Sequence, residues 1–344
     1  MRVLVAMSGG VDSSAAAARA VEAGHDVTGV TLKLWGGESD SGCCSASDVA
    51  DARRVADHLG IDHHVFNFGD DFERDVIGPY VRAHREGRTP NPCVECNRHL
   101  KFDRLLTRAV ALGFDRLATG HHARLVDTAD GPRLARGADA AKDQSYVLWM
   151  LDAAQLARLQ FPVGDMTKDD VRAEASRLDL RTADKPDSQD VCFVASTVGR
   201  DGFLAKRFSP TPGRVVDTAG NEIGAVDAVE LVTIGQRRGL GTGGNGERRF
   251  AVDVDVATTT VTVGRREDLL CDRTPVEGFA WTGEAPAGPV TVQTSAHGTP
   301  AAAVVHGDSV VWDRPQRRVA PGQSVVVYDG DVVVGGGIAA RPPA

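Results

Sequence analysis

The stretch VLVAMSGGVDSSAAAA, residues 3–18, decides the fold of this chain. A β-branched run, a Gly-Gly pair and an alanine-rich segment follow one another in the order strand, tight loop, helix. Such a loop points backbone N–H groups and the positive end of a helix at one spot, where the hydroxyls of Ser8, Ser13 and Ser14 add donors. We therefore expect a phosphate to bind there. The alternative is an ordinary glycine turn.

The first part of the chain continues to alternate between the two kinds of element. Strands are predicted at residues 27–34, 64–68 and 115–119, and helices at 48–59, 72–85 and 100–112. Gly24, Gly60 and Gly113 follow predicted helices, where a left-handed residue is favoured. This alternation predicts a doubly wound parallel α/β sheet, which binds ligands at the carboxyl ends of its strands.

The composition of the sequence changes past about residue 195, where helical periodicity is lost and glycine and proline become more frequent. Short β-rich runs occur at residues 213–216, 249–256, 259–263, 290–293, 301–305, 324–328 and 332–334. Such runs predict small β domains, including a barrel. We divide the chain into a catalytic α/β domain (1–195), a small central domain (196–267) and a C-terminal β-barrel (268–344).

Composition limits the partners of the chain. With 344 residues it is long enough for two or three domains. Its net charge of −8 confines any contact with nucleic acid to local patches. The arginines at 237–238, 248–249, 265–266, 314 and 317–318 would supply such patches, unless they are only solvated surface. No apolar stretch of membrane-spanning length and no leader peptide is present, so we expect a cytoplasmic protein with no membrane partner.

Two cysteine segments carry candidate chemistry. In TPNPCVECN, residues 89–97, Cys96 precedes a basic helix start, which is expected to lower a thiol pKa and make the thiol nucleophilic. Half of a zinc site is an alternative, although Cys43 and Cys44 are badly spaced to complete it. A thioredoxin-like redox pair is another, but that motif should follow a strand in a smaller fold.

The second segment is KPDSQDVCF, residues 185–193, in which a polar, proline-containing stretch precedes Cys192. A lone cysteine before phenylalanine is often buried packing, yet this context is typical of a loop that presents a thiol. If the two segments meet, Cys96 and Cys192 could exchange sulfur.

Several strings occur in one order along the chain: SGGVDS, TPNPxxxCN, ATGHxA, KDQSY, DSQxxCF and IGQRRGLG. The first is not a Walker A loop, because no Gly-Lys-Ser/Thr follows its glycines, and it resembles the loop of the ATP pyrophosphatase (PP-loop) superfamily. The whole set resembles the tRNA-specific 2-thiouridylase family, nearly end to end. The resemblance implies ATP-dependent thiolation of the wobble uridine in tRNAs for Lys, Glu and Gln. The uridine O2 would be adenylated and sulfur would come from a cysteine persulfide, giving 2-thiouridine, AMP and pyrophosphate.

The resemblance also implies roles for single residues. ATP would bind at Ala6, Met7, Ser8, Gly9, Gly10, Val11, Asp12, Ser13, Leu32 and Gly120. Asp12 would help to hold Mg²⁺. Cys192 would carry the persulfide and Cys96 would be the nucleophile that assists sulfur release, ending in a Cys96–Cys192 disulfide. The target base would be lined by Asn91, Pro92 and Cys93, and the tRNA contacted by His121, Lys142, Asp143, Gln144 and Gln323.

The partners implied are tRNA and a sulfur donor, either a cysteine desulfurase or a relay protein. One departure concerns an Arg-Tyr pair that family members often carry in a C-terminal strand, where this chain has Val292–His297. Two rival functions remain at this stage. One is a PP-loop ligase that adenylates a small molecule and needs neither thiol, and the other is a module that binds ATP or tRNA without catalysis.

Overall fold

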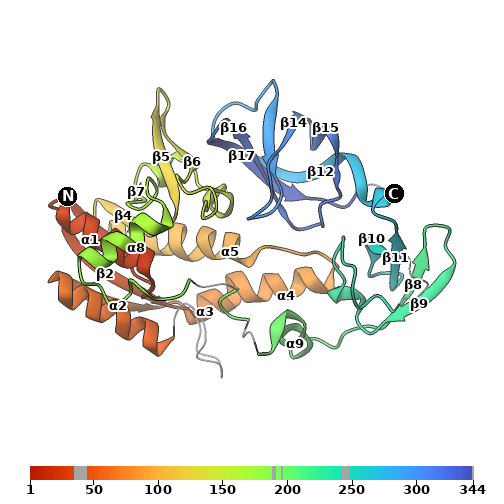
Figure 1. Ribbon diagram of the computed structural model, residues 1–344, viewed down its shortest axis with the longest axis horizontal. Coiled ribbons are helices and arrows are strands. Elements are labelled where there is room, and N and C mark those ends of the chain that lie inside the picture. The colour runs from red at the N-terminus through yellow and green to blue at the C-terminus, as the bar shows by residue number, and fades with distance from the viewer. Residues whose placement is uncertain (35–44, 188–190, 195–196, 242–247, 343–344) are drawn as a thin grey trace. The chain divides into compact units, whose positions relative to one another are not determined.

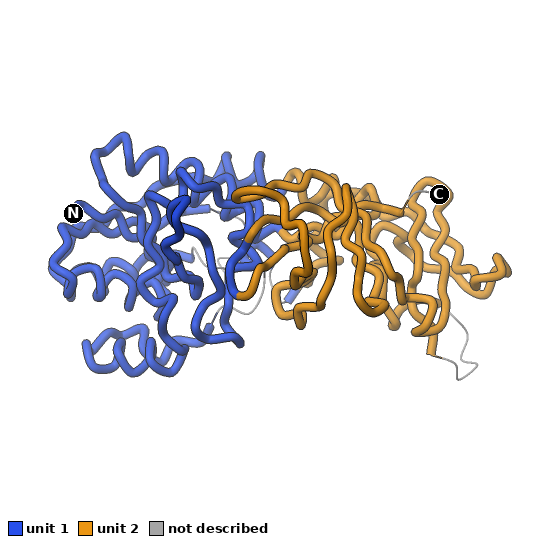
Figure 2. The backbone as a smooth tube through the Cα atoms, turned by 90° about the horizontal axis from the view of Figure 1, so that it is seen from above, with its two compact units in different colours: residues 1–77, 92–197, 331–333 blue, residues 78–91, 198–330, 334–344 orange. Residues whose placement is uncertain are grey.

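The computed structural model describes residues 1–34, 45–187, 191–194, 197–241 and 248–342. They form two compact units (Figure 2). Unit 1 comprises residues 1–77, 92–197 and 331–333, and unit 2 comprises residues 78–91, 198–330 and 334–344.

A parallel sheet forms the centre of unit 1, with the strand order β3-β2-β1-β4-β7. Its strands are β1 (Arg2–Ala6), β2 (Asp26–Lys33), β3 (Asp62–Asn67), β4 (Arg116–Thr119) and β7 (Leu159–Gln160). Val3, Leu4 and Val5 of the central strand are fully or almost fully buried, as expected where both faces of a sheet are covered. The predicted doubly wound parallel α/β fold is confirmed.

Three helices share one hydrophobic core with this sheet (Figure 1): α1 (Val11–Glu22), α2 (Ala46–Leu59) and α8 (Lys168–Arg177). The alanines at 15–18 of α1 are almost completely buried, and their small side chains allow close packing. Ser45 and Asp48 form a capping box at the start of α2. Thr167 and Asp170 form another at the start of α8, a helix that our sequence analysis did not include.

The helix predicted at residues 100–112 begins earlier than expected. A continuous helical run consists of α5 (Pro92–Glu95), the π-helical segment η2 (Cys96–Leu105) and α6 (Leu106–Ala111). Proline is favoured at the first helical position because its missing N–H and fixed φ cost nothing there. Cys93 and Cys96 therefore lie in the first turns of a helix, and our expectation that both precede it was wrong.

Unit 1 also contains short elements around this framework. They are α3 (Gly69–Phe72), η1 (Glu73–Ile77), η3 (Ser145–Leu148), α7 (Ala153–Leu156) and the hairpin of β5 (Ala123–Thr128) and β6 (Gly131–Arg136). None of the helices in the described part of the chain is long and apolar enough to cross a membrane.

Unit 2 contains a four-stranded sheet and a closed barrel. The sheet has the order β10-β11-β8-β9, with β8 (Gly213–Asp217), β9 (Glu222–Val226), β10 (Phe250–Asp255) and β11 (Thr260–Gly264). The barrel strands are β12 (Leu270–Trp281), β13 (Val290–Gln293), β14 (Ala301–His306), β15 (Ser309–Arg317), β16 (Ser324–Asp329) and β17 (Val332–Ala339). Pairing of β12 with β17 closes the barrel. Helices α4 (Gly78–Arg85) and α9 (Gly199–Ala205), with η4 (Val229–Leu231) and η5 (Glu267–Leu269), complete the unit.

The predicted β-rich runs and C-terminal barrel are confirmed, but the two longest barrel strands were missed. Strand β12 contains Pro275 and Gly278, and β15 contains Pro315 among charged residues. Each of these residues usually argues against a strand. Gly278 lies where the pairing of β12 with β17 shifts register, and Pro315 lies where the pairing of β12 with β15 shifts register.

Candidate nucleotide and thiol site

The loop between β1 and α1 leaves the start of the helix open. Gly10 is the N-cap residue and has no side chain to accept a hydrogen bond. The Ser13 and Ser14 hydroxyls donate to the Gly10 carbonyl at 3.0 and 2.9 Å, and the Ser8 N–H donates to Ser13 Oγ at 3.1 Å. Two of the three hydroxyls expected to meet a phosphate therefore order the loop instead. The free N–H groups of the first helical turn remain suited to an anion.

Two glycines make room for this loop. Gly9 has φ +75°, and a Cβ there would lie 2.3 Å from the Asp48 carbonyl oxygen at the start of α2. Gly120 follows β4, and a Cβ there would lie 2.6 Å from the backbone of Asp12 and Ser13. Since the carboxyl ends of β1 and β4 thus approach the start of α1 closely, the residues present fit a nucleotide phosphate chain at the predicted place.

Asp12 is the acidic residue of the loop, and its carboxylate contacts two buried side chains, Lys168 and His122. Its Oδ1 and Oδ2 accept from Lys168 Nζ at 2.7 and 2.8 Å, and Oδ1 lies 3.1 Å from His122 Nε2. Burial alone would raise the pKa of Asp12, but the hydrogen bonds from His122 and Lys168 outweigh it and lower the pKa. Asp12 is therefore ionised at neutral pH.

Lys168 also reaches Asp187, at 2.9 Å, and so joins the nucleotide loop to the segment that leads to Cys192. Asp187 further accepts from Lys142 at 2.7 Å and from Arg172 at 2.9 Å. Burial would raise the pKa of Asp187, yet the hydrogen bonds from Lys142 and Lys168 lower it to about 2.

Lys185 makes a second connection from the same segment to the loop. Its Nζ donates to the Gly9 carbonyl at 2.9 Å, to Asp48 Oδ1 at 2.6 Å and to Asp51 Oδ2 at 2.9 Å. These two carboxylates raise the pKa of Lys185 although burial opposes them. We call residues 185–187 the clamp segment, because Lys185 contacts the nucleotide loop directly at Gly9 and Asp187 contacts it through Lys168.

The thiols differ in their surroundings. Cys96 is buried, Cys93 is exposed and Cys192 is half-buried. The neighbour of Cys192, Phe193, is buried with its ring 5.6 Å from that of Phe72, which anchors the segment beside the thiol. In unit 2, burial raises the pKa of the Cys271 thiol and makes it a poor nucleophile. The pairing of Cys96 with Cys192 stays a prediction.

Several predicted tRNA contacts of unit 1 are engaged inside the protein. His121 is buried beside Phe102 and Phe161, and burial holds its pKa well below the ordinary value. Asp143 accepts from Arg136, from the Gly137 N–H and from Ser145. These two side chains shape the site from within.

The remaining predicted contacts lie nearer the surface. Gln144 is exposed, and its Oε1 accepts from the His122 N–H at 2.9 Å. The Lys142 side chain is 39% exposed, so it can meet RNA while it pairs with Asp187.

Gln323 of unit 2 has a visible structural role. Its Nε2 donates to the Thr89 carbonyl at 2.6 Å, and the Thr89 N–H donates to the Pro321 carbonyl at 2.7 Å. The turn at 321–323 thereby holds the start of the TPNP stretch that leads to Asn91. Within the described residues, Gln323 Oε1 accepts no hydrogen bond and stays available to a ligand.

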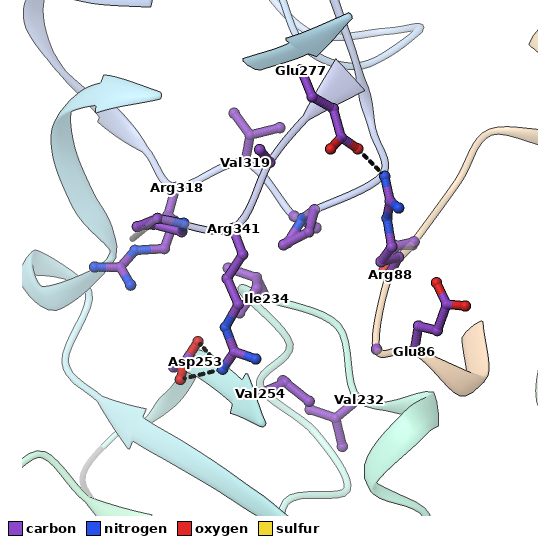
Figure 3. A pocket seen from close by; sticks show the side chains of 16 residues that line it. Glu86, Arg88, Val232, Ile234, Asp253, Val254, Glu277, Arg318, Val319 and Arg341 are labelled. Carbon is purple, nitrogen blue, oxygen red and sulfur yellow. Dashed lines mark hydrogen bonds and ion pairs between the residues drawn. The ribbon is translucent and has the colours of Figure 1, made fainter. Parts of the chain in front are cut away.

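A cavity of about 240 Å³ borders the same stretch within unit 2 (Figure 3). Among the charged residues that line it, Arg341 pairs with Asp253 at 3.1 Å and Arg88 pairs with Glu277.

Comparison with known proteins adds the family. The model described as the tRNA methyl transferase HUP domain matches residues 1–196, the tRNA methyl transferase PRC-barrel domain matches 201–265, and the aminomethyltransferase beta-barrel domain matches 272–339. The tRNA-specific 2-thiouridylase MnmA of Thermobifida fusca is 47% identical over 97% of this chain and 94% of its own length. That of Streptomyces coelicolor is 48% identical over 97% of this chain and 93% of its own length. This chain belongs to the tRNA-specific 2-thiouridylase family.

The predicted family is thus confirmed. Among solved structures, the U34-tRNA thiolase NcsA from Methanococcus maripaludis aligns with 56% of this chain and 61% of its own, at 15% identity and a TM-score of 0.38. That likeness is too weak to inform the site.

Within this thiouridylase framework, the sequence analysis missed the cations that organise the site. Lys168 was not singled out, and Lys185 and Asp187 were quoted only as flanks of Cys192. The capping box at the start of α8 was a usable signal for a helix beginning at Lys168. No local pattern reveals that its ammonium lies against Asp12, 156 residues away in sequence.

Asp12 is the residue that our sequence analysis assigned to Mg²⁺. No group of three or more His, Cys, Asp or Glu side chains able to hold a metal occurs in the described ranges. Cys43 and Cys44, which a zinc site with Cys93 and Cys96 would need, lie outside the described residues. A carboxylate offers about four lone-pair sites, and the bonds from Lys168 and His122 leave room on Oδ2 of Asp12. This fits Mg²⁺ that is held mainly by phosphates and by one carboxylate.

Proposed function

We propose that this chain thiolates the wobble uridine of tRNAs for Lys, Glu and Gln, using ATP and a persulfide sulfur. The observation that carries the proposal is the clamp segment, which joins a phosphate-binding loop to a cysteine segment through Lys185, Lys168 and Asp187. A small-molecule ligase of the PP-loop type has no need of such a connection.

Activation of the base begins at the loop. ATP would lie along Ala6–Ser13, Leu32 and Gly120, with its phosphates at the first turn of α1. Asp12 would contribute one ligand to the Mg²⁺ that accompanies the triphosphate. The uridine O2 attacks the α-phosphate and pyrophosphate leaves, which converts O2 into part of a good leaving group.

Sulfur transfer then needs two thiols. The outer sulfur of a Cys192 persulfide attacks C2 of the uridine, and the C2–O bond breaks with loss of AMP. The Cys96 thiolate attacks Cys192 Sγ, so the persulfide S–S bond breaks and the sulfur stays on C2. A Cys96–Cys192 disulfide results, because the two protein thiols supply the two electrons that reduce the transferred sulfur. An external thiol then reduces this disulfide back to two thiols.

The RNA would be read around this chemistry. Asn91, Pro92 and Cys93 would line the target base, which lies in a single-stranded loop and can be splayed out at little cost. Lys142, Gln144 and Gln323 would contact the tRNA, and the buried His121 and Asp143 would shape that surface from inside. A cysteine desulfurase or a relay protein would load Cys192.

The test is nucleoside mass spectrometry on unmodified tRNA for Lys, Glu or Gln, incubated with the protein, Mg-ATP and a persulfide source. We expect 2-thiouridine at the wobble position. AMP and pyrophosphate formation without 2-thiouridine would overturn the acceptor, and product formation by a variant lacking both Cys96 and Cys192 would overturn the sulfur route.

A further inference from the structure

An arginine-lined hollow in unit 2 is not used by the chemistry proposed above. It has a volume of about 470 Å³. Five exposed arginines line it, from the segment before β10, the turn after β11 and the end of β15: Arg237, Arg248, Arg265, Arg266 and Arg317. Such a concentration of one charge stands out in a chain with net charge −8.

Most of these guanidinium groups are available to a ligand. Within the described residues, Arg237, Arg248, Arg266 and Arg317 make no ion pair or side-chain hydrogen bond. Among the described residues that line the hollow, Glu267 alone carries a carboxylate. The next carboxylate, Asp268, is occupied, because it accepts from the Arg265 N–H at 2.7 Å.

The segment that carries Arg237 is held by hydrogen bonds of its neighbour Gln236. Gln236 Oε1 accepts from the Thr233 N–H at 3.1 Å, and Gln236 Nε2 donates to the Arg238 carbonyl at 2.9 Å. The Ala251 N–H donates to the Gln236 carbonyl at 2.9 Å, which ties this loop to β10. Arg237 is therefore presented on a fixed loop, so less entropy is lost on binding.

We propose that this hollow binds the phosphodiester backbone of the tRNA substrate. Arginine matches phosphate oxygens with a planar fork of donors, and several forks around one depression fit a bend of a polyanion. Half-buried Phe250 provides an aromatic wall on which a base or ribose can pack. The inference rests on the proposed function, since it takes tRNA as the ligand.

The test compares tRNA binding by wild type, an Arg266→Gln/Arg317→Gln double variant and Arg214→Gln, over a series of salt concentrations. Arg214 is an exposed arginine of the same unit that donates to Thr260 and does not line the hollow, so it controls for lost charge. For the double variant we expect a salt slope smaller by about 2 and affinity lower by roughly tenfold at moderate salt. The KM for tRNA should rise with little change in kcat, and thermal unfolding should be unchanged.

Each other outcome has a defined meaning. A double variant with the wild-type slope and affinity overturns the inference. If it binds tRNA normally but accepts sulfur poorly from a protein donor, while inorganic persulfide still serves, the hollow docks an acidic protein instead of RNA. Should wild type itself fail to bind and thiolate tRNA, the proposed function fails rather than this assignment.

Discussion

Asp187→Asn tests whether the clamp segment keeps Cys192 in position. The substitution preserves shape but removes the charge that faces Lys168, Lys142 and Arg172. Asp187 lies five residues before Cys192 and does not line the nucleotide loop. The variant should therefore separate sulfur transfer from adenylation.

The expected cost follows from the pKa of Asp187. Its fall from the ordinary 3.8 to about 2 corresponds to roughly 2.5 kcal/mol in favour of the ionised form. The side chain is 22% exposed, and water screens part of the interaction, so we expect a stability loss of about 1–2 kcal/mol. Because the folded-state pKa is depressed, this contribution is present above about pH 4 and is lost as the pH falls towards 2.

Two assays read the variant. Urea unfolding at pH 7 should show the stability loss, and the difference from wild type should narrow below pH 4. In turnover assays, tRNA-dependent pyrophosphate release should stay within a few-fold of wild type, while 2-thiouridine formation falls about tenfold or more. Glu22→Gln is the control, since it removes one carboxylate of an exposed pair with Arg177 in the same unit.

Either of two results would refute this reasoning. Thiolation at the wild-type rate in a measurably destabilised Asp187→Asn variant would show that the ion pairs only stabilise the fold. An equal loss of pyrophosphate release and of thiolation would place Asp187 in nucleotide binding.

Three further predictions concern other parts of the chain. Burial lowers the pKa of His84 to about 4 from 6.5, so unfolding stability should drop by about 2 kcal/mol between pH 7.5 and 5. In the His84→Phe variant, urea titrations should show no such fall in the free energy of unfolding between pH 7.5 and 5. A variant with the wild-type pH profile would contradict the assignment to His84. Gly9→Ala should weaken ATP binding at least tenfold in calorimetry, because its Cβ would meet the Asp48 carbonyl at φ +75°; wild-type affinity would mean that the loop adapts. Cys192→Ser should release pyrophosphate with tRNA present yet form no 2-thiouridine, and product at the wild-type rate would move the persulfide elsewhere.

The nucleotide loop was predictable because its signals are local. The β-branched run before Gly9 and the alanines after it encode a strand, a turn and a helix within residues 3–18, and the structure has β1 and α1 there. The start of the cysteine helix was missed for an equally local reason. Our sequence analysis began this helix at residue 100, although the proline at position 92 begins α5.

The barrel edges and the ion-pair chain could not be predicted in this way. Strand β12 is defined by its partners β15 and β17, since its own proline, glycine and charged residues oppose a strand. The local sequence around Lys168, KDDVRAEASR, likewise does not indicate the role of this residue, because the sequence is typical of an exposed polar helix. Its side chain is nonetheless buried, because Asp12 and Asp187 provide the opposite charges that an ammonium requires in the interior.

This arrangement constrains how the site can work. A buried ammonium that bridges two carboxylates is stable only while both remain ionised and in reach. In the proposed function, phosphates at the first turn of α1 would bring further negative charge close to Lys168 and would compete with Asp187 for the same ammonium. Asp187 also pairs with Lys142 and Arg172, which, within the described residues, do not contact Asp12. Because three cations surround the half-buried Asp187, its carboxylate keeps two partners even without Lys168.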